Sequence, residues 1–238
     1  MIWNILDAIK TYLGGGIPAG IGLTNITEII TAIAALGTAA SGFVDTLKTL
    51  PKGGVSHIGF RTIKARLKPV ASAFTAIGEL DPWNTLHANW INGVATSQQK
   101  AIVKSLVYLG LTPNNAPGLA AALGVDKDGL IGATTSSQTG TPLTAQQTNV
   151  LGRFDTMLSA LIDAGYEEAD QQYRNWSKLY ASIIAVVLAV IAAAFLGFNL
   201  ILAVLIGLVS TPLAPVAKNL TSSLQAAASA MNAVKKPG

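Results

Sequence analysis

The chain has 238 residues, of which 50% are hydrophobic and only 12% are charged, against about 25% charged in average globular proteins. A mean hydropathy of +0.47 favours a membrane protein over a secreted or disordered one. The net charge of +4 is spread along the chain, whereas nucleic-acid-binding proteins gather Lys and Arg on one face, so we expect no nucleic-acid partner. The absence of cysteine excludes disulfides, thiolate metal sites and a Cys nucleophile.

The first predicted element is a short amphipathic helix over residues 1–16. Its apolar residues recur at helical spacing, and Asn4, Asp7 and Lys10 fall on the other side. With Trp3 near its start, such a helix could lie in a membrane interface or pack on the protein's own core. Because Asp7 and Lys10 interrupt any apolar run, we do not expect a secretory signal here.

Residues 17–54 contain a second helix, predicted over 25–49, that is rich in Ala and Gly. Sixteen uncharged residues separate Glu28 from Asp45, slightly fewer than the about 20 that cross a bilayer. Small side chains let helices approach closely, as they do in membrane bundles. We interpret this segment as a tightly packed helix, either inserted in the membrane or lying against its neighbours in an assembly.

A soluble helical region is predicted over residues 55–128, followed by a loop over residues 129–143. Breakers such as Asp81-Pro82 divide the first region into separate helices. The loop is predicted because the segment is uncharged and rich in Gly, Ser and Thr. The expected helices span residues 58–79, 84–94, 96–109 and 116–124.

A long amphipathic helix is predicted over residues 144–177, and it leads directly into an uncharged stretch. Its first part carries a large apolar face, and its last part is polar. Where it meets the uncharged stretch, aromatic and basic side chains cluster as they do at the surface of a membrane. The residues predicted at the membrane interface are Trp3, Tyr173, Arg174, Trp176, Lys178, Tyr180 and Lys218.

No charged side chain occurs between Lys178 and Lys218. As a single helix, these 39 residues would be about 58 Å long, nearly twice the roughly 30 Å of the hydrocarbon layer. We therefore predict a transmembrane helical hairpin over residues 178–216, with one long tilted span and a buried soluble hairpin as the alternatives. The predicted turn residues are Gly197, Phe198 and Asn199.

The charges at the ends of this stretch predict its orientation. Basic residues flank both ends, and a basic amphipathic tail is predicted over residues 217–238. Because cytoplasmic loops are enriched in Lys and Arg, both ends of the hairpin are expected on the cytoplasmic side of the inner membrane.

The sequence has no group of residues typical of an active site. His57 and His87 are the only histidines, and neither has a second histidine or a carboxylate at metal-ligand spacing. We therefore expect no catalytic residue, no cofactor and no metal, and a protein that is not an enzyme.

Two C-terminal segments resemble a group of uncharacterised bacterial inner-membrane proteins. GRFDTML at 152–158 is similar to the acidic-aromatic motif that opens the last helix of that group, and GLVSTPLAPVAKNLTSSL at 207–224 is similar to the segment that closes the second span. Between 159 and 178 the chain departs from the group, because a longer acidic helix replaces the usual basic Trp-Tyr run. The resemblance implies a soluble helical middle and a C-terminal hydrophobic helix pair, and it implies no activity.

Together these features predict an all-α, membrane-anchored protein with a C-terminal transmembrane hairpin. Membrane lipids are the expected contacts, and the expected partners are copies of the same chain or subunits of a larger membrane complex. The expected role is structural or accessory. The alternative is a pore-forming or membrane-disrupting effector, because a hydrophobic hairpin carried by a helical domain resembles pore-forming colicin domains in outline.

Overall fold

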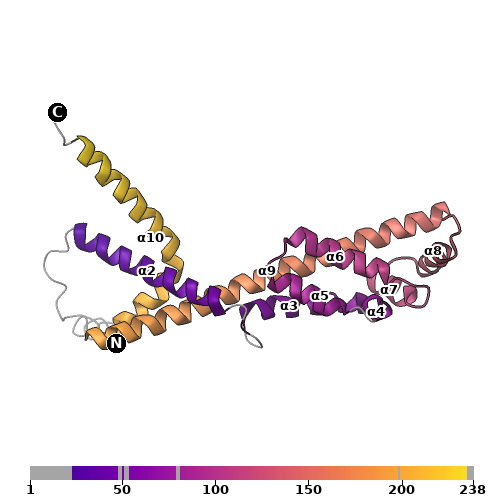
Figure 1. The fold of residues 1–238 in the computed structure, drawn as a ribbon, viewed down its shortest axis with the longest axis horizontal. Helices are drawn as coiled ribbons and strands as arrows, with labels where there is room; N and C mark the ends of the chain where they lie inside the picture. The colour runs from indigo at the N-terminus through magenta and orange to yellow at the C-terminus, as the bar shows by residue number, and fades with distance from the viewer. Residues whose placement is uncertain (1–22, 48–49, 51–53, 79–80, 198, 235–238) are drawn as a thin grey trace, which may run out of the picture. The chain divides into compact units, whose positions relative to one another are not determined.

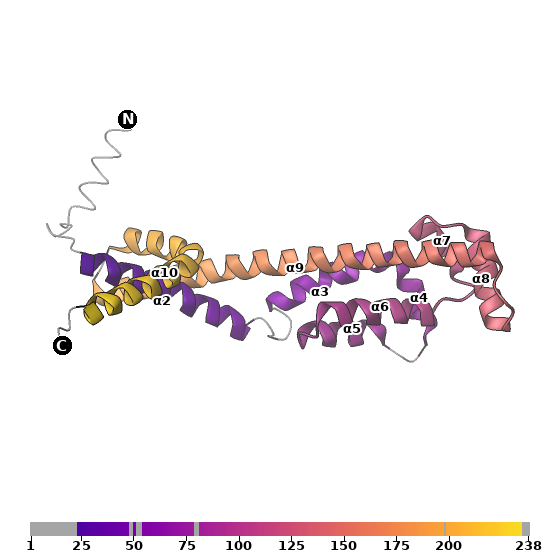
Figure 2. The same ribbon diagram turned by 90° about the horizontal axis from the view of Figure 1, so that it is seen from above.

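The helical patterns of the sequence correspond to nine α-helices and one short 3-10 helix in the computed structural model, which describes the chain except residues 1–22, 48–49, 51–53, 79–80, 198 and 235–238. The described residues contain no strand, so this part of the chain is all-α, as predicted (Figures 1 and 2). The amphipathic helix predicted over 1–16, with Trp3, and the turn residue Phe198 lie outside the described residues.

By its internal contacts the chain divides into two units. Residues 45–177 form one of them, called the bundle unit here, and residues 1–44 with 178–238 form the other, called the hairpin unit. The long helix α9 contributes to both units. In chain order the helices are α2 (Leu23–Leu47), α3 (Val55–Arg66), η1 (Lys68–Val70), α4 (Ala71–Ala76), α5 (Pro82–Ile91), α6 (Thr96–Leu109), α7 (Ala116–Leu123), α8 (Lys127–Thr139), α9 (Ala145–Leu196) and α10 (Leu200–Val234).

The core of the bundle unit forms on one apolar face of α9. Large side chains recur on this face at spacings of three and four residues, and the short helices supply fully buried partners such as Ile63, Leu86 and Val103. Burying one such side chain stabilises a fold by about 1.5–3 kcal/mol, so this face holds the short helices together. The buried residues of α9 in this unit include Val150, Phe154, Leu158, Ile162, Tyr166 and Ala169.

The single helix predicted near 58–79 is wrong, because the chain forms three elements there. After α3, the segment Lys68–Val70 turns as the 3-10 helix η1, and α4 follows. Pro69 explains the break, since it has no N–H to donate and disfavours α-helical geometry in the preceding residue. The turn brings both Val70 and Phe74 into the core.

The loop predicted over 129–143 is also wrong, because most of that segment belongs to α8. The Asp126 carboxylate caps the start of the helix by accepting a hydrogen bond from the Gly129 N–H at 2.9 Å. Gly140, with φ of +70°, ends the helix in the left-handed conformation that glycine adopts most easily.

Serine and threonine hydroxyls account for the wrong prediction of a loop. These groups compete with the backbone for hydrogen bonds and so favour turns. In α8 they instead bond within the helix, as Thr134 donates to Leu130 O at 3.0 Å and Thr135 donates to Ile131 O at 2.9 Å. Leu130 and Ala133 are buried in the core, and this burial favours the helix over a loop.

In the hairpin unit, the predicted turn coincides with a break between two helices. α9 ends at Leu196, and Gly197 follows with φ of +71°. Asn199 then caps α10, because its Oδ1 accepts a hydrogen bond from the Ile201 N–H at 2.8 Å. The stretch over 178–216 therefore folds as two helices rather than as one continuous helix.

No break separates the predicted second limb from the predicted tail. α10 continues through Pro212 and Pro215 to Val234. Each proline lacks an N–H, so the carbonyls of Leu208 and Thr211 lose their usual helical donors. Both views show α10 bent in its middle, as expected for a helix with internal prolines (Figures 1 and 2).

Candidate functional site

The interior of the hairpin unit consists mainly of small side chains, and Val44 is the larger side chain buried there among the described residues. On α9 every fourth residue is buried, and each of these residues is alanine. Helices α2 and α10 also turn small residues inward. The buried small residues are Gly37 and Ala40 on α2, Ala181, Ala185, Ala189 and Ala193 on α9, and Ala203, Gly207 and Ser210 on α10.

Glycines bring the backbones of these helices into direct contact. A β-carbon at Gly207 would lie 2.5 Å from the Cα of Val186, so α10 rests on the backbone of α9. A β-carbon at Gly37 would overlap the carbonyl of Ser210 and lie 2.7 Å from the Cβ of Ala214. Helix α10 is therefore packed against α9 and against α2 as closely as the backbones allow.

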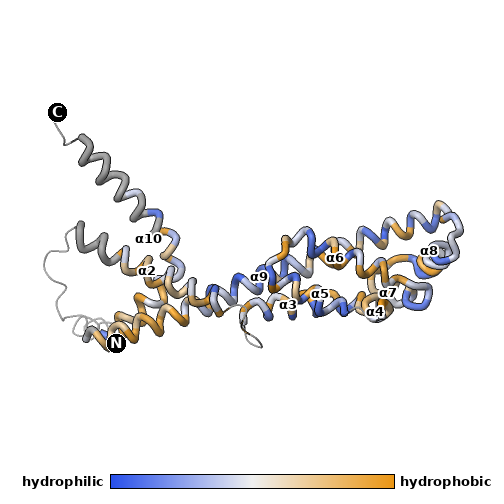
Figure 3. Tube along the Cα trace, viewed as in Figure 1, coloured by the Kyte–Doolittle hydropathy of each residue, from blue (hydrophilic) through white to orange (hydrophobic). Residues whose placement is uncertain are grey.

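The exterior of the same unit is made of large apolar side chains. On α9 they recur every fourth residue, halfway between the buried alanines, and the exposed fraction of Phe195 reaches 87%. Figure 3 shows this end of α9 and the first part of α10 as strongly hydrophobic. The exposed residues are Leu179, Ile183, Val187, Ile191 and Phe195 on α9, and Leu200, Ile201, Leu202, Val204, Leu205, Leu208, Val209, Leu213 and Val216 on α10.

Helix α9 therefore buries large apolar side chains in the bundle unit and small side chains in the hairpin unit. In the bundle unit α9 buries residues such as Phe154 and Leu158, whereas in the hairpin unit it buries Ala185 and exposes Val187. Large apolar side chains are buried when the surrounding solvent is water. Lipid tails remove that driving force, and helices in a bilayer associate through small residues instead.

Helix length and composition agree with this contrast. Among the described residues, two helices are long and apolar enough to cross a membrane, over Ile30–Leu47 in α2 and within Ala145–Phe195 of α9. Leu200–Val216 of α10 is a shorter apolar helix. The surface of large apolar side chains on α9 and α10 is the candidate functional site, and it is called the apolar surface from here on.

The residues predicted at a membrane interface differ in their exposure and in their contacts. Trp176 and Tyr180 are 39% and 38% exposed, and Lys178 follows the last residue of the bundle unit. Arg174 is engaged, because its Nε lies 2.7 Å from the Asp170 carboxylate one helical turn earlier. Lys218 lies within α10, and Trp3 lies outside the described residues.

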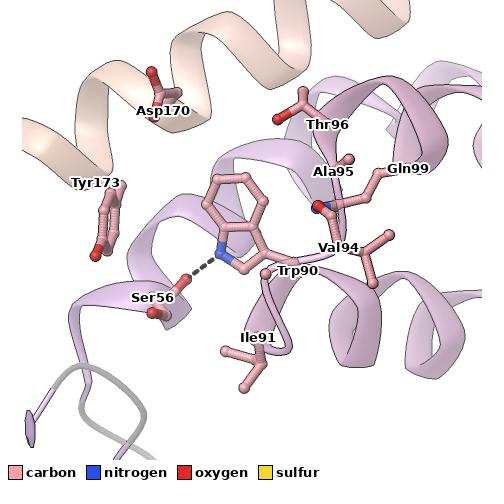
Figure 4. Close-up of a pocket in the computed structure, with 10 residues that line it drawn as sticks. Ser56, Trp90, Ile91, Val94, Ala95, Thr96, Gln99, Asp170 and Tyr173 are labelled. Atoms are coloured by element: carbon pink, nitrogen blue, oxygen red, sulfur yellow. Dashed lines mark hydrogen bonds between the residues drawn. The ribbon is translucent and has the colours of Figure 1, made fainter. Parts of the chain in front are cut away.

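Tyr173 belongs to the bundle unit and faces a pocket there. Its ring stands at 90° to the Trp90 ring of α5, with 6.4 Å between the ring centroids. The pocket has a volume of about 310 Å³. Figure 4 shows Trp90 in its middle, with Ser56, Gln99 and Asp170 around it.

The two histidines meet in the bundle unit although 30 residues separate them in the sequence. His87 Nε2 lies 3.1 Å from His57 Nδ1, and the Phe60 ring contacts the His87 ring at a tilt of 55°, with 4.7 Å between ring centroids. Burial and the neighbouring His57 lower the pKa of His87. No short motif indicates this pair, because the packing of α3 against α5 brings the two rings together.

Among the described residues, no group of three or more His, Cys, Asp or Glu side chains is placed to hold a metal ion. Comparison of the chain with protein-family models, with curated proteins and with solved structures finds no match.

Proposed function

We propose that the protein is a membrane-anchored structural or accessory protein that associates with copies of itself or with subunits of a larger membrane complex. In this proposal the hairpin unit lies in the inner, cytoplasmic membrane, and the bundle unit is its aqueous, cytoplasmic part. One observation carries the proposal, namely small side chains inside the hairpin unit and large apolar side chains outside it.

In water, that arrangement would be unfavourable. Soluble monomers rarely expose contiguous apolar patches larger than a few hundred Å². The side chains of Val187, Ile191 and Phe195 are each about half exposed or more, and they continue one stripe along α9. A bilayer contacts such a surface at no cost, whereas an aqueous setting would require another protein to cover it.

The outward face of α2 supports association. Gly37 and Ala40 of this helix are used within the hairpin unit. Ala35, Ala39 and Gly42 remain exposed on another face, and nothing lies within 4 Å of where a β-carbon of Gly42 would be. Helices in membranes pair through such faces, so α2 is the element proposed to contact a neighbouring subunit.

A charge placed on the apolar surface tests the membrane anchor. In this proposal the double variant Val187→Asp with Val204→Asp loses membrane association, because one charge at the centre of a bilayer costs about 2.5–3.5 kcal/mol on insertion scales. The matched control is Leu109→Asp in the bundle unit, at a side chain that is 65% exposed. The measurement is the fraction of protein that stays with membranes after alkaline carbonate extraction.

The control should behave like the unaltered protein, and the double variant should move to the soluble fraction. Retention of the double variant in the membrane fraction, at the level of the control, would rule out the proposed anchor.

Particle size tests the structural role. After extraction in mild detergent, the proposal predicts a regular assembly, and Ala39→Leu should reduce its size if α2 forms the contact. A small monomer or dimer that makes liposomes leak would contradict the structural role and favour a pore-forming effector.

A further inference from the structure

We propose that the pocket around Trp90 binds a small ligand through a positively charged ammonium group. The pocket lies within the bundle unit, so binding of an ammonium group does not depend on the membrane role proposed above, and only the lipid-headgroup form of the proposal rests on that role. Helix α3 supplies Ser56, α5 supplies Trp90, α6 supplies Gln99, and α9 supplies Asp170 and Tyr173 (Figure 4).

Two aromatic rings form a corner of this pocket. Trp90 and Tyr173 stand at 90° to each other, 6.4 Å apart between centroids. The indole N–H of Trp90 donates to the carbonyl of Ser56 at 2.8 Å, which fixes the ring and uses its only polar donor. Faces of Trp and Tyr rings attract cations within about 6 Å, and quaternary ammonium ligands are recognised in this way.

Gln99 adds a buried acceptor that has no donor. Only 3% of this residue is exposed, and its Nε2 donates to Val94 O at 2.5 Å. If the Gln99 amide were rotated by half a turn, its Oε1 would face the carbonyl oxygen of Val94. The contact with Val94 therefore assigns Nε2 to the position beside that carbonyl. The remaining Oε1 is buried without a hydrogen-bond partner. A buried acceptor of this kind requires a donor from a ligand or a water.

The charged side chains at the pocket determine whether it favours a positive or a negative ligand. Asp170 contributes a carboxylate, and none of the ten residues that line the pocket is Lys or Arg. Arg174 pairs with Asp170 at 2.7 Å, and the two side chains are 69% and 44% exposed, so solvent screens the pair and Arg174 offsets the carboxylate only in part. Aromatic faces, an unpaired carbonyl and a carboxylate together favour an ammonium group.

The volume limits the ligand to a small molecule. A cavity of about 310 Å³ lies at the lower end of the range for ligand sites. The ammonium group could belong to a free amine, or to the ethanolamine or choline headgroup of a lipid. Both sources offer a positive charge to Trp90 and Asp170. A free amine or an ethanolamine headgroup also offers an N–H to Gln99, whereas a choline headgroup has no N–H to donate.

Binding is tested with the full chain in dodecyl maltoside, a detergent that carries no amine. Choline, ethanolamine and the neutral choline isostere 3,3-dimethylbutan-1-ol are titrated by calorimetry. We expect the two cations to bind with a dissociation constant on the order of 1 mM, and the neutral isostere to bind at least about fivefold more weakly. Equal binding of choline and its isostere would overturn the proposal, and so would no binding of either cation.

Variants assign the binding to this pocket. Asp170→Asn, Tyr173→Leu and Gln99→Leu should each weaken choline binding by about fivefold or more while the melting temperature stays close to that of the parent. The matched control is Glu167→Gln, which also removes an exposed carboxylate of α9 from an ion pair, with Lys100 at 3.3 Å, but lies outside the pocket. A loss of binding in the control equal to that in Asp170→Asn would contradict the assignment.

The lipid composition of nanodiscs distinguishes a free amine from a lipid headgroup as the natural ligand. In nanodiscs of phosphatidylglycerol alone, free choline should bind as it does in detergent. If a lipid headgroup is the natural ligand, phosphatidylethanolamine in the nanodisc should suppress choline binding. If the natural ligand is a free amine, choline should bind equally in both lipids. Absence of choline binding in phosphatidylglycerol would contradict both forms of the proposal.

Discussion

Gly207 of α10 rests on the backbone of Val186 in α9, so closely that a single methyl group at position 207 would come within 2.5 Å of the Val186 Cα. Contact between helix backbones requires a residue without a side chain at the crossing point. The hairpin unit is built around this contact and its counterpart at Gly37, and its larger apolar side chains point outward as a result.

A matched pair of glycine substitutions tests this packing. Gly207→Ala should destabilise the hairpin unit by about 1–3 kcal/mol, the usual cost of overpacking a closely packed interior. Gly152→Ala should be neutral or stabilising, because Gly152 is also helical and nothing lies within 4 Å of the added atom. The measurement is the apparent melting temperature in detergent. Equal melting temperatures for the two variants would contradict the observed packing.

The motif GRFDTML, whose resemblance suggested a membrane protein, has a clear role in the bundle unit. Phe154 is fully buried, and the Asp155 carboxylate accepts hydrogen bonds from Lys104 Nζ at 2.7 Å and Tyr108 Oη at 2.8 Å. The motif therefore ties α9 to α6. Its aromatic residue contributes burial, and its acidic residue joins two donors of the neighbouring helix.

Asp155→Asn is expected to destabilise the bundle unit by about 1 kcal/mol at neutral pH, because the interaction is partly exposed. The hydrogen bond from Lys104 is the main cause that lowers the pKa of Asp155 below its usual range. A carboxyl group with a lowered pKa stabilises the folded state above the pKa of the unfolded chain, and that stabilisation is lost as the pH falls. The difference between the parent and Asp155→Asn should therefore shrink in acid.

Thermal unfolding at pH 7 and at about pH 3 measures this difference. Tyr108→Phe serves as the control, since it removes one hydrogen bond and leaves the Lys104 contact, and it should cost less than Asp155→Asn. A difference that stays constant with pH would show that the Asp155 charge does not contribute.

The lowered pKa of His87 predicts a second pH dependence of the free energy of unfolding, at higher pH than the dependence caused by Asp155. Its pKa is lowered, mainly by burial and secondarily by His57, so the unfolded chain binds protons more readily than the folded one. The free energy of unfolding should therefore fall as the pH decreases through about 6.5 and below. In His87→Phe this part of the decrease should be smaller. Melting temperatures between pH 5 and pH 8 measure it, and identical slopes for parent and variant would contradict the prediction.

Several elements could be predicted from sequence because their causes are local. Asp81-Pro82 indicated a break between helices, and α5 begins at this break, where the Asp81 Oδ1 accepts a hydrogen bond from the Asn84 N–H at 3.0 Å. Pro82 occupies the first turn of α5, where its missing N–H has no consequence. Glycine at position 197 likewise indicated the end of α9, because it adopts a positive φ without strain.

Other features depend on tertiary packing and have no local signal. The contact between His57 and His87, and the pocket beside Trp90, arise where separate helices meet. The interior of the hairpin unit, by contrast, has a local signal in the sequence that the predictions did not use. Alanine at every fourth position from Ala181 to Ala193 is visible in the sequence, and it marks the face along which α9 packs.

The measurement that most directly tests the central claim is the accessibility of single spin labels in liposomes. The chain has no cysteine, so each variant carries one thiol. Labels at Val187→Cys, Ile191→Cys and Leu205→Cys lie on the apolar surface, and labels at Leu109→Cys and Met157→Cys lie on the exposed surface of the bundle unit. The first group should collide often with oxygen and rarely with a water-soluble nickel complex, and the second group should show the reverse. Equal access of the nickel complex to both groups would contradict a membrane role for the hairpin unit.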